Sequence, residues 1–177
     1  MSRSLVTLGV MILMTAAPSP GRPAGGQKTD GDVAVPEGQV FKLSRDTITV
    51  AKEPGGDGRR TCTVKAAAAP TEVKMKAQKW ALGFVPAAKK DRVEIERVLD
   101  PGPLQSMRST PKMAGKPGDW LPDPGDVITH VNGYAVKSVQ DVVCAVNAAE
   151  DPDDIQLVVR DVNDGKQYVF YVSAAKK

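Results

Sequence analysis

Apolar and charged residues alternate in several short segments of this chain, as they do in half-buried β-strands. The clearest segment is Arg92–Val98, which reads RVEIERV. Residues 126–131 repeat the alternation and run into an Asn-Gly pair, which is a strong signal for a tight turn. Residues 155–162 and 166–172 flank an Asn-Asp-Gly turn and predict a hairpin. The second half of the chain therefore favours a small, mostly antiparallel sheet.

A helical period begins after Ser138, which can cap a helix with Asp141 as its capping-box partner. Apolar residues then recur at helical spacing, at Val139, Val142, Val143, Val146 and Ala149. Residues 104–107 can form one further short helical turn. This order of elements predicts an α+β fold, in which a small, mostly antiparallel sheet or partial barrel is capped by two helices.

The first 72 residues divide into three parts by composition. Residues 1–17 combine Arg3 with an uncharged apolar run, as a secretory signal peptide does. Residues 18–38 are rich in Pro, Gly and Ala and predict a flexible linker. Residues 39–72 contain two alternating runs around a Gly-rich turn and predict a small β-hairpin. Because an isolated hairpin is marginally stable in water, we expect it to pack on the larger domain or on a partner.

Composition narrows the classes of function. The 177 residues are 41% hydrophobic and 25% charged, which is typical of a soluble globular protein. The net charge is only +3, and aromatic residues are 5% of the chain and do not interleave with basic ones, so no nucleic-acid partner is expected. The signal peptide predicts an exported protein, periplasmic, at the cell surface or secreted, without a stable membrane span.

Residues suited to catalysis or metal binding are sparse. His130 is the only histidine, and no nucleophile motif or phosphate-binding loop accompanies it. We expect His130 to lie at the surface or on an edge strand, and we expect no enzymatic activity. For Cys62 and Cys144 we favour two unpaired, partly buried thiols over a disulfide. Neither their spacing nor the number of potential ligands supports a metal site, and no cofactor is expected.

The stretch WALGF at residues 80–84 is either the start of a core strand or an open loop that receives a ligand. Around it, residues 73–174 resemble a PDZ domain, particularly the type carried by HtrA-like bacterial proteases, although no protease domain is evident in the sequence. The resemblance rests on four stretches in the right order: Ala81-Leu-Gly-Phe84; Asp100-Pro-Gly-Pro-Leu104; Pro124-Gly-Asp-Val-Ile128 with Val131-Asn-Gly133; and the helix after Ser138 with the two strands that follow it.

The resemblance implies a PDZ-like fold with a peptide-binding groove. In PDZ domains a Gly-containing loop presents backbone N–H groups to the C-terminal carboxylate of a peptide, which adds a strand to the sheet. Gly83 suits this role because glycine adopts positive φ and allows close approach to the backbone. The implied peptide-binding residues are Ala81, Leu82, Gly83, Phe84, Val85, Val139, Val143 and Val146. Pro86 departs from the pattern, because it lacks the N–H of one rung of strand pairing.

The helix leaves two interpretations open. Val142, Val146 and Ala149 form an apolar stripe that a core requires. Val139 and Val143 extend this stripe to one side, where they line a groove or belong to a wider buried face, against the N-terminal hairpin for example.

Together these features predict an exported, non-catalytic module that binds extended peptides or protein C-termini. One alternative is a structural or assembly subunit whose groove is filled by its own residues 39–72. Another is a regulatory partner of a separate envelope protease.

Overall fold

The computed structural model describes residues 37–67, 69–75, 80–100, 102–106 and 122–176. The predicted signal peptide at 1–17 and nearly all of the linker at 18–38 lie outside these residues, as does most of the loop at 108–123. The strands are β1 (Val40–Ser44), β2 (Thr47–Val50), β3 (Arg60–Lys65), β4 (Pro70–Lys74), β5 (Trp80–Ala81), β6 (Phe84–Lys89), β7 (Arg92–Val98), β8 (Val127–Val131), β9 (Tyr134–Ala135), β10 (Ile155–Arg160), β11 (Gln167–Val172) and β12 (Ala175–Lys176).

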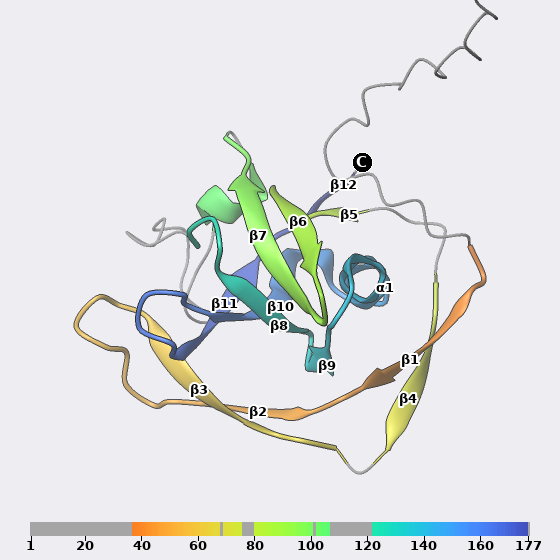
Figure 1. Ribbon diagram of the computed structural model, residues 1–177, viewed down its shortest axis with the longest axis horizontal. Helices are drawn as coiled ribbons and strands as arrows, with labels where there is room; N and C mark the ends of the chain where they lie inside the picture. The colour runs from red at the N-terminus through yellow and green to blue at the C-terminus, as the bar shows by residue number, and fades with distance from the viewer. Residues whose placement is uncertain (1–36, 68, 76–79, 101, 107–121, 177) are drawn as a thin grey trace, which may run out of the picture.

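The main sheet is open and antiparallel. Its strand order is β2-β3-β11-β10-β8-β7-β6, with β9 paired to β8 (Figure 1). Both end strands, β2 and β6, have one edge that no described strand covers, and β1-β4 and β12-β5 form separate two-stranded sheets. The described residues therefore have a mainly-β fold, in which hairpins such as β6-β7 and β10-β11 are combined with long-range pairings such as β3 with β11.

The expected α+β fold, with a partial barrel capped by two helices, is wrong. The described residues contain one α-helix, α1 (Val139–Asn147), and the sheet does not close. Within the described residues, the second expected helix is a single 3₁₀ helix, Pro103–Ser106, which begins at a proline, a residue that is tolerated in the first turn of a helix because its missing N–H is not needed there. Another 3₁₀ helix spans Pro152–Asp154. The N-terminal segment contributes four further strands, β1 to β4, to a structure in which the described residues contain a single α-helix.

The N-terminal hairpin is longer than the sequence predicts and is bent. β2 pairs with β3 within the segment 39–72, and β1 pairs with β4 beyond the bend. β4 runs across the expected boundary between residues 72 and 73. The hairpin packs on the domain, as expected, because β3 pairs with β11 at Thr61 and Arg60. In Figure 1 the four strands form an arc beneath the sheet that ends beside α1.

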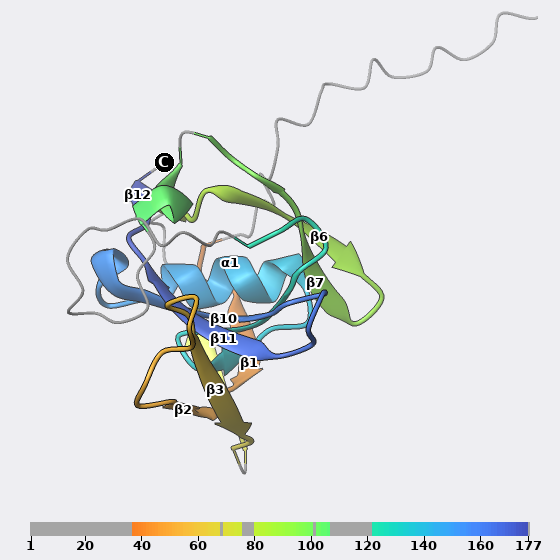
Figure 2. The same cartoon turned by 90° about the vertical axis from the view of Figure 1, so that its left-hand side faces the viewer.

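The capping signal that predicts α1 is correct. The Ser138 side chain accepts from the backbone N–H of Asp141, whose carboxylate accepts from the N–H of Ser138. α1 lies between β6 on one side and β1 with β4 on the other, as the two perpendicular views in Figures 1 and 2 show. Its buried side chains join one hydrophobic cluster with β8, β10 and β11. The helix is therefore covered on two faces.

Candidate functional site

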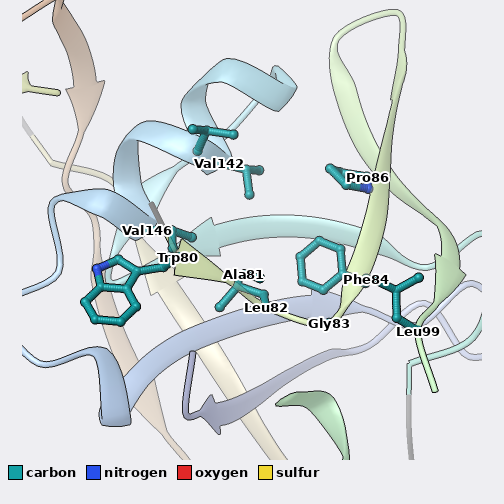
Figure 3. Close-up of a pocket in the computed structure, with 10 residues that line it drawn as sticks. Trp80, Ala81, Leu82, Gly83, Phe84, Pro86, Leu99, Val142 and Val146 are labelled. Atoms are coloured by element: carbon teal, nitrogen blue, oxygen red, sulfur yellow. The ribbon is translucent and has the colours of Figure 1, made fainter. Parts of the chain in front are cut away.

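An apolar pocket opens between α1 and the uncovered edge of β6 (Figure 3). It encloses about 80 Å³, well below the roughly 300–1,000 Å³ of pockets that hold drug-sized ligands. Its lining residues are Trp80, Ala81, Leu82, Gly83, Phe84, Pro86, Leu99, Val142, Val143 and Val146. The size suits an apolar side chain rather than a whole cofactor.

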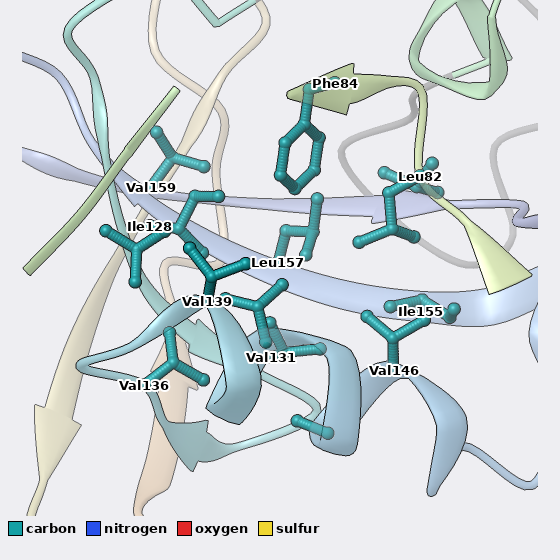
Figure 4. Close-up of a cluster of buried hydrophobic side chains, with 14 of the residues drawn as sticks. Leu82, Phe84, Ile128, Val131, Val136, Val139, Val146, Ile155, Leu157 and Val159 are labelled. Atoms are coloured by element: carbon teal, nitrogen blue, oxygen red, sulfur yellow. The ribbon is translucent and has the colours of Figure 1, made fainter. Parts of the chain in front are cut away.

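The pocket is an outward continuation of the hydrophobic core. Figure 4 shows Leu82 and Phe84 pointing into the same cluster as Ile155 and Leu157. In Figure 3, Val142 and Val146 project from α1 toward the side occupied by Phe84. Because these walls are buried and packed, the pocket is preformed. Leu82-Gly83-Phe84 is thus both the start of a core strand and the rim of an open pocket.

Gly83 holds the loop against the turn that follows β7. Its φ is +81°, and a Cβ on it would lie 2.7 Å from Pro103 Cδ and 2.8 Å from Pro103 N. The Gly83 carbonyl accepts a hydrogen bond from the N–H of Leu99 at 2.9 Å. Glycine is required here by a left-handed conformation and by backbone contact at once.

The loop leaves backbone donors available. Across all the residues that the structure describes, the N–H groups of Leu82 and Gly83 have no hydrogen-bond partner. They lie in the loop that joins β5 to β6, at the rim of the pocket. Successive backbone N–H groups at a turn can form a site for an anion. The loop can therefore accept a carboxylate without losing an existing bond.

The uncovered edge of β6 also has free backbone groups. Phe84 is paired with Val98, and the bond from Leu99 N to Gly83 O marks this as a non-hydrogen-bonded pair. In such a pair the backbone groups of both residues point away from the partner strand. Phe84 therefore directs its N–H and C=O outward. Pro86 follows the register shift between β6 and β7, and edge strands and bulges are where proline is tolerated.

Short β5 positions the other end of the loop. Trp80 pairs with Lys176 and Ala81 with Ala175 in the antiparallel β5-β12 sheet. The N–H of Ala174 donates to the carbonyl of Pro152 at 2.7 Å and fixes the approach to β12. The loop is consequently held on both sides, by β12 before it and by the Pro103 turn after it.

Six of the eight residues implied by the PDZ resemblance line this pocket, namely Ala81, Leu82, Gly83, Phe84, Val143 and Val146. Val85 and Val139 are buried but are not among the lining residues. Val142, which we assigned to the core alone, lies both in the core and at the pocket wall.

Sequence reasoning missed Trp80, Pro86 and Leu99 as lining residues. Trp80 directly precedes the loop, and this position in the sequence is enough to predict that it lies near the pocket. Leu99 carries no such signal, because its position depends on how β7 pairs with β6.

His130 does not lie at the surface or on an edge strand, contrary to expectation. It is 7% exposed on β8, between β7 and β10 in the sheet. Its Nε2 lies 3.2 Å from Asp46 Oδ2, and its Nδ1 lies 3.0 Å from Thr129 Oγ1. A polar residue can occupy this position because Asp46 of the N-terminal hairpin meets it there. The side chain joins the hairpin to the sheet.

Asp46 is the centre of this partly buried polar contact. Its Oδ1 accepts from Ser44 Oγ at 2.8 Å and from the N–H of Ala67 at 3.0 Å. Burial alone would raise the pKa of Asp46, but the bonds from Ala67, Ser44 and His130 together lower it below the ordinary value of 3.8. Ser44 bonds to Asp46, and no bond between Ser44 and His130 is present among the described residues, so this trio lacks the order of a hydrolytic triad.

Both cysteines are free thiols. Burial raises the pKa of Cys62 and of Cys144 to about 11, which keeps both protonated at neutral pH and poorly nucleophilic. Within the described ranges, no group of three or more His, Cys, Asp or Glu side chains could hold a metal ion.

No helix among the described residues is long and apolar enough to cross a membrane. No protein-family model and no curated protein matches this chain. The geometry of the pocket and the residues that form it therefore carry the functional argument.

Proposed function

We propose that this protein binds the C-terminal end of an extended peptide or protein chain in the groove between β6 and α1. The observation that carries the proposal is an apolar pocket lying beside an uncovered strand edge, with unbonded N–H groups at its rim. These are the three features that recognition by strand addition requires. The resemblance of residues 73–174 to PDZ domains supports the same mode of binding.

The bound peptide runs along β6 as an additional strand. Its terminal carboxylate accepts from the N–H groups of Leu82 and Gly83, and its last side chain enters the pocket against Val142 and Val146. Phe84 supplies one N–H and one C=O to the new ladder. Pro86 supplies no N–H, so side-chain burial near the terminus provides more of the affinity than the ladder does.

The protein acts in this proposal as an exported binding module without catalytic activity. None of the described residues of segment 39–72 lines the pocket, which favours an open groove over one filled by this segment. The ligand is accordingly another chain, and the protein that carries it can be a structural partner or an envelope protease.

A comparison of free and amidated peptides tests the proposal. A library of peptides with apolar C-termini is screened against the full chain, and the best binder is remade with a C-terminal amide. Each charge-assisted hydrogen bond contributes roughly 1.5–3 kcal/mol, so amidation should weaken binding about tenfold or more. Titration calorimetry measures the two Kd values. If no peptide in the library binds, the proposal is wrong. If the free and the amidated peptide bind equally well, the loop does not recognise the C-terminal carboxylate.

Val143→Asp tests the pocket itself. Val143 is partly buried at the pocket wall, so the variant should fold and lose peptide affinity about tenfold or more, because an unpaired charge would face an apolar ligand. The control is Gln140→Asp, which places the same charge at an exposed position of α1 and should bind peptide normally. Circular dichroism confirms folding of both variants. Equal affinities in the two variants would place the binding site elsewhere.

A further inference from the structure

The two sides of α1 contact different parts of the molecule. Val142 and Val146 face the pocket. Cys144 lies two residues from each of them, about 200° around the helix, and so points to the opposite side. There its Sγ lies 3.9 Å from the carbonyl oxygen of Val73 in β4. Cys144 is fully buried, although it belongs to the side of α1 that faces away from the groove.

The N-terminal hairpin provides this outer cover. Leu43 of β1, Val73 of β4 and Met75 are buried at 4–5% exposure in the same cluster as α1, and both strands contact the helix. In Figure 1, β1 and β4 lie on the other side of α1 from β6. One wall of the groove is thus packed against an element outside the region that resembles a PDZ domain.

The hairpin is itself attached firmly to the sheet. β3 pairs with β11, and Arg59 Nη1 donates to Asp161 Oδ2 at 2.8 Å. Near the bend, the N–H of Asp46 donates to the carbonyl of Gly133 at 2.7 Å, and Asp46 meets His130. These contacts fix the hairpin to the same sheet that contains β6. The packing of the hairpin against the outer side of α1 is therefore supported by the contacts between the hairpin and the main sheet.

Side-chain packing is what sets the distance between α1 and β6. They belong to different elements with the pocket between them, and no backbone hydrogen bond joins the two within the described residues. A wall held only by packing shifts when the packing on its other side is lost. The width of the groove then depends on both faces of α1.

We infer that the N-terminal hairpin is a positioning element of the groove, which holds α1 at the spacing from β6 that binds peptide. The inference rests on the proposed function for its effect on affinity. When the packing of the hairpin is loosened, a smaller fraction of the molecules has a groove of the width that binds peptide. The apparent affinity for the peptide falls in proportion to this fraction. This is the reverse of a self-filled groove, in which loss of the hairpin would raise the affinity.

Val73→Ala tests the inference, with Val159→Ala as its matched control. Both valines are buried, but Val159 lies in β10, at the far end of the core from Val146 in Figure 4. Both variants should melt at a lower temperature than the wild type. Well below either melting temperature, Val73→Ala should bind the selected peptide at least about threefold more weakly. Val159→Ala should stay within about twofold of the wild type.

Hydrogen exchange of the peptide-free protein provides a second reading. The amides of α1 should exchange faster in Val73→Ala than in Val159→Ala, at equal distance from the respective melting temperatures. Equal exchange of α1 and equal affinity in the two variants would overturn the inference, and a higher affinity in Val73→Ala would identify the hairpin as a competitor. If the wild type binds no peptide, the proposed function fails, while the exchange rates still decide whether the hairpin holds α1.

Discussion

Gly83→Ala should lower the free energy of unfolding by about 2–5 kcal/mol. A left-handed backbone costs a non-glycine residue roughly 1–2 kcal/mol. The added Cβ would also lie 2.7 Å from Pro103 Cδ and 2.8 Å from Pro103 N, and overpacking of this kind costs typically about 1–3 kcal/mol. The backbone N of Pro103 cannot move away as a flexible side chain can. The loop must then separate from the turn after β7, which also deforms the rim of the pocket.

Gly165→Ala separates the two contributions. Gly165 has a φ of +71°, and nothing lies within 4 Å of the position of its Cβ. This variant should lose only the roughly 1–2 kcal/mol of backbone strain. Chemical denaturation of both variants measures the difference. Equal losses at Gly83 and Gly165 would contradict the close contact between the loop and Pro103.

Asp46→Ala should destabilise the protein by about 3 kcal/mol at neutral pH. The substitution leaves His130 Nε2, Ser44 Oγ and the N–H of Ala67 without their acceptor, and each buried donor left without an acceptor costs roughly 1–3 kcal/mol. We take the lower end, because both side chains keep 8–10% of their surface exposed.

Asp46→Asn isolates the role of the charge. Ser44 and Ala67 both donate to Oδ1, which the amide retains, so this variant should lose less than Asp46→Ala. The pKa of Asp46 is lower in the folded protein than its ordinary value. Its charge therefore stabilises the fold above the ordinary pKa of 3.8, and this contribution is lost as the pH falls through the lower, folded pKa.

Denaturation at about pH 7 and about pH 2 measures this dependence. The advantage of the wild type over Asp46→Asn should shrink at the lower pH. A constant difference between the two proteins across this range would show that the carboxylate is not held in its charged form by these bonds.

Local patterns predict the elements that depend on neighbours in sequence. The alternation at Arg92–Val98 and the capping pair Ser138 and Asp141 each specify a strand or helix without further information. The bend of the N-terminal hairpin is different, because β1 pairs with β4 at separations of 26–34 residues and neither strand has strong alternation. The predicted fold class is wrong because the described residues contain a single α-helix and a sheet that does not close, and the unpredicted pairing of β1 with β4 adds further strand.

The candidate site divides in the same way. The Leu82-Gly83-Phe84 loop is recognisable because a glycine interrupts an apolar run. The burial of His130 cannot be recognised from its neighbours in sequence, because it depends on Asp46, which lies 84 residues away. A single polar residue in a strand is usually exposed, and only the register of a distant segment shows that this one is paired.

The long separations across the N-terminal hairpin have a consequence for how the chain folds. Arg59 meets Asp161 across 102 residues, and β3 pairs with a strand close to the C-terminal end of the described chain. Contacts between residues so far apart in the sequence form slowly, because the chain loses conformational entropy in bringing them together before the contacts themselves stabilise the fold. As the ribosome releases the chain from its N-terminus, β2 and β3 exist before β11 does. We therefore expect docking of this hairpin to be a late step of folding, preceded by an interval in which its strand edges are open to other chains.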